Sequence, residues 1–128
     1  MIYAKLYDEF VGLFPEDKAF FHAMEEKTGA DKEDGMHVIF GMVVCPYIIS
    51  LLSTNPEKAQ KAFDFVEEME TSGDSDIVNV AEVSILEVIM TDEKGGIENM
   101  KKYMGKESLA AIEHMSQFFN LPQTTKTQ

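Results

Sequence analysis

Residues 63–93, FDFVEEMETSGDSDIVNVAEVSILEVIMTDE, determine most of the fold that the sequence predicts. The stretch is typical of the end of one amphipathic helix, a short polar turn and a second helix, 77–90, which is apolar on nearly every side. A helix of that kind must be covered by other helices. The rest of the chain is therefore expected to pack around residues 77–90.

Apolar residues at three- and four-residue spacing predict further helices on both sides of this stretch. Their ranges are 2–13, 15–27, 36–53, 56–71, 97–104 and 107–119. Pro15 and the pair Asn55-Pro56 are helix-start signals. Pro46 removes a backbone donor inside 36–53 and predicts a kink or a split there.

Two helices have well-defined predicted inward faces. That of 15–27 consists of Ala19, Phe20, Ala23 and Met24. That of 56–71 consists of Ala59, Ala62, Phe63, Val66 and Met69. In the turn that follows, Asp74, Ser75 and Asp76 are expected to cap the next helix rather than to bind a metal.

The predicted fold class is all-α, because no segment shows the alternation of a strand. We expect six or seven short helices in a compact helical bundle or a HEAT-like right-handed array. The chain has 128 residues, enough for one hydrophobic core. We expect a single domain over 1–120 and a disordered polar tail over 121–128.

The cysteine content and one apolar segment bear on the cellular compartment. Cys45 is the single cysteine, which excludes an internal disulfide and a multi-cysteine zinc site and favours a reducing cytoplasm. Residues 35–56 carry no formal charge and are long enough to span a membrane. His37, Pro46 and Tyr47 within them favour a buried core helix, so no membrane association is expected.

The charge is strongly uneven along the chain. Residues 1–62 carry ten acids and six Lys (−4), residues 63–93 carry ten acids and no base (−10), and residues 94–128 carry three acids and five Lys (+2). The sum is −12, and there is no Arg. Negative charge and the lack of Arg both argue against nucleic acid as a partner. A basic protein is the electrostatic expectation.

The sequence carries none of the common catalytic motifs. It has no glycine-rich phosphate loop, no G-x-S-x-G and no H-E-x-x-H. We therefore predict no catalytic residue, no metal ligand and no cofactor, and we expect a protein that is not an enzyme.

Five carboxylates are the candidate partner-binding residues: Asp64, Glu67, Glu68, Glu82 and Glu87. The first three lie three and four residues apart, on the polar face of 56–71. In an α-helix Glu82 and Glu87 would point about 140° apart, so they are not expected to share one site. Two other interpretations remain for them: edge positions that meet solvent, a Tyr or a Lys, and a metal site completed by a His of another helix.

Three segments together show a family resemblance: YDEFVGLFPE, then FDFVEEMETSGDSDIVNVAEVSILEVI, then MKKYMG. Over about residues 3–118 the chain resembles small bacterial all-α proteins that act as immunity proteins in contact-dependent growth inhibition and polymorphic-toxin systems. The resemblance implies a protein that binds and neutralises a cognate toxin domain. We expect a cytoplasmic monomer or homodimer, because the single cysteine favours the cytoplasm and the many Met and Phe leave room for a dimer. It assigns no catalytic residue.

An acidic helical face fits such a role, because it could imitate the phosphates that a basic nuclease toxin binds. Two alternatives from other classes stay open. One is a helical adaptor that binds a protein unrelated to toxins. The other is a protein that binds a metal through carboxylates and His.

Overall fold

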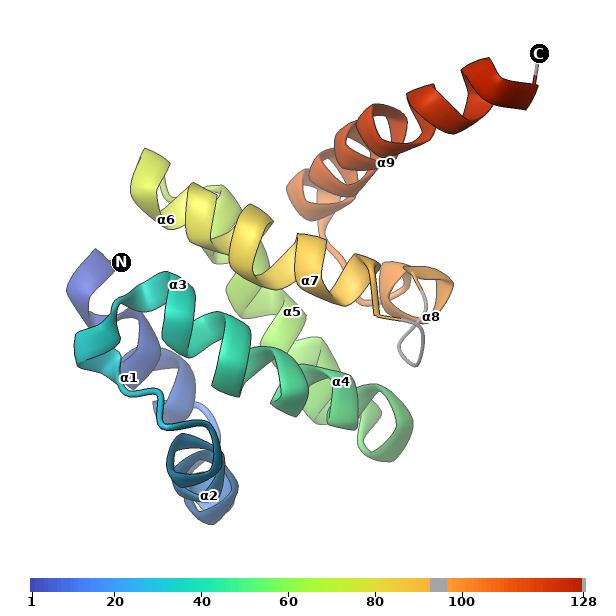
Figure 1. Ribbon diagram of the computed structural model, residues 1–128. Helices are drawn as coiled ribbons and strands as arrows, with labels where there is room; N and C mark the ends of the chain where they lie inside the picture. Colours follow the sequence, from blue (N-terminus) through green and yellow to red (C-terminus); the bar gives the residue numbers. More distant parts are fainter. Residues whose placement is uncertain (93–96, 128) are drawn as a thin grey trace.

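The computed structural model describes residues 1–92 and 97–127, and the side chains of residues 1–92 and 98–117. The described residues form seven helical segments and no strand (Figure 1). This confirms the all-α prediction and gives a helical bundle.

The first two segments each begin with a 3-10 turn. Their elements are η1 (Tyr3–Lys5) and α1 (Leu6–Gly12), then η2 (Pro15–Asp17) and α2 (Lys18–Thr28). Gly29 ends α2 in the left-handed region, at φ 75°, which glycine adopts without steric cost. A third 3-10 turn, η3 (Lys32–Asp34), is closed by a capping box between Asp31 and Asp34.

The third segment is a continuous helix made of α3 (Met36–Ile39), η4 (Phe40–Val44) and α4 (Cys45–Thr54). η4 is π-helical, and the backbone N–H of Cys45 donates to the Phe40 carbonyl five residues earlier. Pro46 follows directly. In an α-helix its ring would clash with the carbonyl of Met42, and the wider π-helical turn lies at that place. The helix is therefore not split at Pro46.

The next segment, α5 (Pro56–Glu70), agrees with its prediction. The Asn55 side chain caps it by accepting from the Lys58 N–H at 3.1 Å. All the residues expected on its inward face are buried: Ala59, Ala62, Phe63, Val66 and Met69. Phe65 is buried as well.

The central helix consists of α6 (Ser75–Asn79), η5 (Val80–Leu86) and α7 (Glu87–Met90). Asp74 caps it by accepting from the N–H groups of Asp76 and Ile77, which confirms the capping prediction. Its middle part, η5, is π-helical, which the sequence analysis did not predict.

The chain ends with α8 (Ile97–Lys101) and α9 (Lys106–Thr127). α9 thus extends beyond the predicted end at 119. The tail predicted for 121–128 falls on residues whose side chains are not described, and residue 128 lies outside the described residues altogether. The disorder of this tail stays a prediction.

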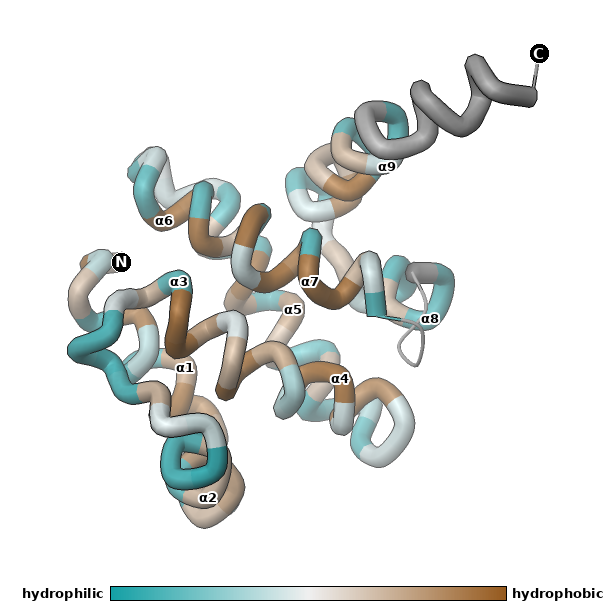
Figure 2. Tube along the Cα trace, viewed as in Figure 1, coloured by the Kyte–Doolittle hydropathy of each residue, from teal (hydrophilic) through white to brown (hydrophobic). Residues whose placement is uncertain are grey.

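The two long apolar helices lie side by side. In Figure 1 the helix α3–α4 and the helix α6–α7 run in the same direction, and α5 runs back behind them. Figure 2 shows hydrophobic residues concentrated along both. Where they meet, the Cys45 thiol donates to the Ser84 carbonyl at 2.9 Å, and His37 Nδ1 lies 2.6 Å from Ser84 Oγ.

Aromatic rings fill the core between α1, α2 and these helices. Phe10 lies at the centre, with ring centroids 5.2 Å from Phe14 and 5.4 Å from Phe65. The buried residue of α2 is Phe21, which is 2% exposed, whereas Phe20 is only partly buried. Ala19 and Ala23 are exposed, so the predicted inward face of α2 is wrong by about one residue.

Met36–Thr54 is the one helix among the described residues that is long and apolar enough to cross a membrane. Half of its most apolar window is buried inside the fold. Phe40, Val44 and Ile48 are fully enclosed, so the segment packs as the predicted core helix.

Candidate functional site

Glu67 joins the C-terminal part of α5 to the start of α9. Its carboxylate accepts from the N–H groups of Glu107 and Ser108 at 2.9 Å each, and from Ser108 Oγ at 2.8 Å. These N–H groups belong to the first turn of α9 and would otherwise have no partner within the helix. Glu67 therefore caps α9 from another part of the chain.

The pKa of Glu67 reflects this role. Burial alone would raise the pKa, but the hydrogen bonds from Glu107 and Ser108 favour the carboxylate and leave the pKa below its ordinary value. Gly105 makes room for the arrangement, because a Cβ there would lie 2.4–2.7 Å from the Glu67 side chain. Glu67 was predicted to bind a partner, and the structure gives it a clear structural role.

Glu70 is in the opposite situation. Its Oε2 is buried and has no hydrogen-bond partner among the described residues. Burial, and then the interaction with the Glu82 carboxyl group and the charges of Glu67 and Glu107, raise the pKa of Glu70 to about 9. The raised pKa favours the protonated form of Glu70 at neutral pH.

Glu70 is not among the predicted site residues, although its position in the sequence gave a signal. It follows Val66 by four residues and Phe63 by seven, and both of these are core residues of α5. A carboxyl group at that spacing lies at the edge of the buried face.

Glu82 and Glu87 lie nearer to one face of their helix than expected, because the segment that joins them is π-helical. The N–H of Glu87 donates to the Glu82 carbonyl in the i to i+5 pattern of a π-helix. This pattern brings residues five apart nearer to the same face, whereas an α-helix would place them about 140° apart. Both side chains are half-buried.

Asp64 and Glu68 lie on the exposed face of α5. The Asp64 carboxylate accepts from Gln60 Nε2 at 2.9 Å. Among the described residues, no hydrogen bond or ion pair links either residue to the helix α6–α7. The five predicted carboxylates therefore do not form one row.

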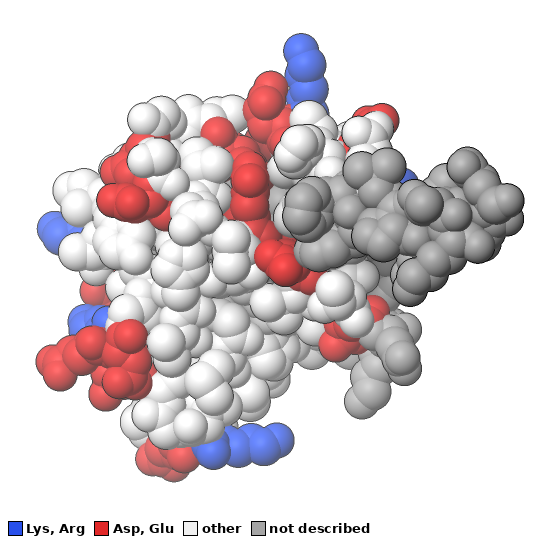
Figure 3. Space-filling model, turned by 45° about the horizontal axis from the view of Figure 1, so that its top comes forward, with Lys and Arg blue, Asp and Glu red and all other residues white. Residues whose placement is uncertain are grey.

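The structure instead places Glu82 beside Glu70, and the charges of Glu67 and Glu107 also act on Glu70. Glu87 lies on the same helix as Glu82, five residues further on. We call Glu70, Glu82 and Glu87 the acidic row. Figure 3 shows acidic side chains in a band through the centre of one face, with the Lys side chains of that face toward its edges. No Lys of the described residues forms an ion pair with a member of the row. The row therefore has no basic ion-pair partner among the described residues.

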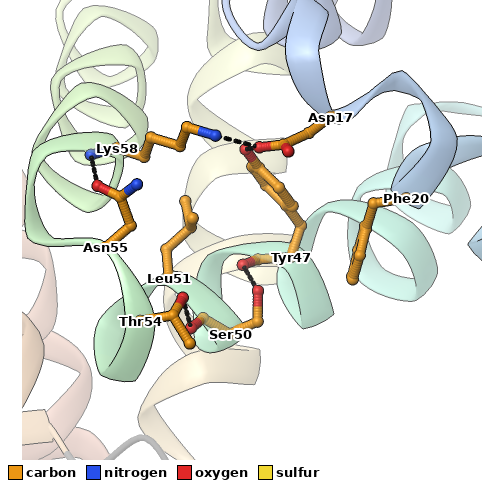
Figure 4. A pocket seen from close by; sticks show the side chains of 8 residues that line it. All are labelled: Asp17, Phe20, Tyr47, Ser50, Leu51, Thr54, Asn55 and Lys58. Carbon is orange, nitrogen blue, oxygen red and sulfur yellow. Dashed lines mark hydrogen bonds and ion pairs between the residues drawn. The ribbon is translucent and has the colours of Figure 1, made fainter.

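A pocket of about 220 Å³ lies between η2, α4 and the start of α5 (Figure 4). In it, Asp17 accepts from Tyr47 Oη at 2.5 Å and from Lys58 Nζ at 2.7 Å. The bond from Lys58, followed by that from Tyr47, lowers the pKa of Asp17. Lys58 also pairs with Glu16 at 3.1 Å. Each of these charged groups has a partner. The contacts hold η2, α4 and α5 together, which gives the pocket a structural role.

The described part of the chain offers little support for metal binding or for nucleophilic catalysis. No group of three or more His, Cys, Asp or Glu side chains there is placed to hold a metal ion. Ser84 and His37 are at the distance of a nucleophile and its base, but Ser84 is only 5% exposed and the pair bridges two helices. Burial raises the pKa of the Cys45 thiol to about 12, so the thiolate is suppressed.

The helices and the acidic row define an all-α domain with a negatively charged edge. Residues 7–120 match a family described as a domain of unknown function, DUF7674, and the chain belongs to this family. Neither the curated proteins nor the solved structures gave a match.

Proposed function

We propose that this chain is an immunity protein that binds a bacterial toxin domain with a basic surface and neutralises it. One observation carries the proposal: the carboxyl groups of Glu70 and Glu82 lie close enough to interact, and the Glu70 Oε2 is buried without a partner among the described residues. Burial and the nearby Glu82 disfavour the charged form of Glu70, and an unpaired buried polar atom reduces stability. A cationic partner at this edge would offset the repulsion between the carboxyl groups.

The charge distribution supports a basic partner rather than nucleic acid. The net charge of −12 repels phosphate and attracts Lys and Arg, and it raises the rate of encounter with a basic protein. The role requires binding alone and no catalytic group. A toxin that enters or arises in the cytoplasm would meet its binder there, and the single reduced Cys45 is compatible with that compartment.

The proposal is tested by co-expressing the chain with the toxin domain encoded next to it. We expect restored growth and a stable complex on gel filtration. No restoration and no complex would overturn the proposal. A complex with a protein that is not toxic would favour the helical adaptor instead.

Charge variants then locate the contact. Glu82→Gln with Glu87→Gln should slow association with the toxin about ten-fold at low salt, because exposed acidic groups steer a basic partner. Glu9→Gln with Glu57→Gln removes the same charge from exposed positions elsewhere and should leave the rate nearly unchanged. Equal rates for the two double variants would place the contact outside the acidic row.

A further inference from the structure

Four large apolar side chains are exposed on the two parallel helices of the core. Val38 and Met42 on the helix α3–α4 are 38% and 44% exposed. Val83 and Val88 on the helix α6–α7 are 46% and 38% exposed. We call these four residues the docking strip. A cluster of apolar residues that the fold leaves uncovered is typical of an interaction surface.

The two halves of the strip belong to helices in direct contact. His37 Nδ1 lies 2.6 Å from Ser84 Oγ across the interface. Val38 directly follows His37, and Val83 directly precedes Ser84. Both helices run in the same direction (Figure 1), and Met42 and Val88 follow Val38 and Val83 by four and five residues.

The π-helical segment η5 aligns the strip with the acidic row. The chain repeats Glu-Val at 82–83 and at 87–88. The bond from the Glu87 N–H to the Glu82 carbonyl brings the two Glu-Val pairs nearer to the same face of the helix. In an α-helix the same pairs would point in different directions. The result is an apolar line with an acidic line beside it.

We infer that the docking strip binds a basic amphipathic helix of the partner protein. Its apolar side chains would cover Val38, Met42, Val83 and Val88, and its Lys or Arg side chains would lie toward Glu82 and Glu87. A helix laid on an apolar groove presents such residues at three- and four-residue spacing. In Figure 3 an uncharged area adjoins the acidic band, as this arrangement requires. The inference rests on the proposed function for the identity of the partner.

Charge complementarity selects this occupant over a second copy of the chain. Two copies joined through their strips would bring two acidic rows together, and each copy carries a net charge of −12. Like charges facing each other across an interface oppose association. A basic helix meets no such repulsion.

The test uses the full chain and a synthetic helical peptide with a Leu face and Lys along one edge of it. Titration followed by ¹H–¹⁵N NMR should shift the backbone signals of the docking strip and of Glu82 and Glu87. A matched peptide with Glu in place of Lys should bind at least ten-fold more weakly. This measurement needs no variant and so does not depend on how any variant folds.

Two pairs of variants check the apolar and the acidic line separately. Val83→Ser with Val88→Ser should weaken peptide binding about ten-fold. Ile2→Ser, at an apolar residue that is 58% exposed and outside the strip, is the control and should have no effect. Glu82→Gln with Glu87→Gln should remove most of the salt dependence of binding.

Peptide shifts elsewhere on the chain, or no binding at millimolar peptide, would overturn the inference. So would a change of oligomeric state in Val83→Ser with Val88→Ser, because the strip would then join two copies. If the toxin is neutralised while these Val substitutions leave that complex unchanged, the docking strip fails and the proposed function stands. If the peptide binds as expected but no toxin is neutralised, the proposed function fails instead.

Discussion

The acidic groups at the two ends of α5 have opposite surroundings. At its N-terminal end, Lys58 bridges Asp17 and Glu16, and Tyr47 donates to Asp17 as well. At its C-terminal end there is no basic residue in the last turn, and Glu70 faces Glu82. Acidic groups also oppose the negative end of the helix dipole there. The contacts at the N-terminal end of α5 stabilise the fold, whereas the carboxyl groups at its C-terminal end reduce stability, and folding alone does not explain why they are there.

Glu67 is the exception at the acidic end, and its removal should have the largest effect. Glu67→Ala loses three hydrogen bonds at the start of α9 and should lower the free energy of unfolding by about 2 kcal/mol. Urea unfolding followed by circular dichroism measures this. Glu68→Ala, on the exposed face of the same helix, is the control and should change stability by less than about 0.5 kcal/mol.

Asp17→Ala should remove the main contacts at the N-terminal end of α5 and lower the free energy of unfolding. Tyr47 Oη loses its acceptor, and Lys58 keeps only its contact with Glu16. We expect a loss of about 1.5 kcal/mol, mainly from the hydrogen bond, since a solvent-exposed ion pair adds little. Urea unfolding again provides the measurement. A variant as stable as the parent would show that the two ends of α5 do not differ in the way proposed.

Gly105→Ala tests the space beside Glu67. The new methyl group would push the Glu67 side chain away from its partners in α9 and should cost about 1 kcal/mol. In the Glu67→Ala background the same change should cost almost nothing, because the obstructing side chain is gone. A thermal-unfolding double-mutant cycle measures the coupling. Additive effects would contradict the contact.

Glu70→Gln should change the free energy of unfolding least at any one pH. Above neutrality it should raise this free energy, whereas the three preceding substitutions lower it. The pKa of Glu70 is raised from 4.5 to about 9 in the folded chain, so the folded state binds the extra proton between these values. The stability that Glu70 contributes is thus fully present below about pH 4.5 and is lost as the pH rises toward 9. Gln cannot ionise, so the variant should lose less stability over this range.

Urea unfolding at a series of pH values follows this difference directly. Glu68→Gln is a matched control on the exposed face of α5 and should keep the pH dependence of the parent. Identical pH profiles for the parent and Glu70→Gln would mean that Glu70 is ionised in the folded chain at neutral pH.

Local signals predicted most of the fold. Asn55 and Asp74 cap the helices that their side-chain chemistry indicates, and α5 buries the expected face. Each of these features depends on residues a few positions apart. The error in α2 has a similar cause, because Phe20 and Phe21 are adjacent and equally apolar. Tertiary packing decides which of the two is buried: both rings contact Tyr47, but Phe21 also packs on the central Phe10 ring, with centroids 6.2 Å apart.

The candidate site was less predictable because it depends on distant partners and on helix geometry. Glu67 was indistinguishable in sequence from Glu68 until α9, forty residues away, supplied its donors. Glu82 and Glu87 were placed apart because the prediction assumed 3.6 residues per turn throughout. The π-helical segment η5 changes that count, and no residue type marks its position.

The contact between Cys45 and the Ser84 carbonyl gives the molecule an internal reporter. Cys45 is the single thiol, is 1% exposed, and lies where the two parallel helices meet. A thiol reagent can reach it only when those helices separate. The rate of alkylation in native buffer therefore counts the opening events of the core, and a ligand that clamps both helices would slow that rate in proportion to its occupancy.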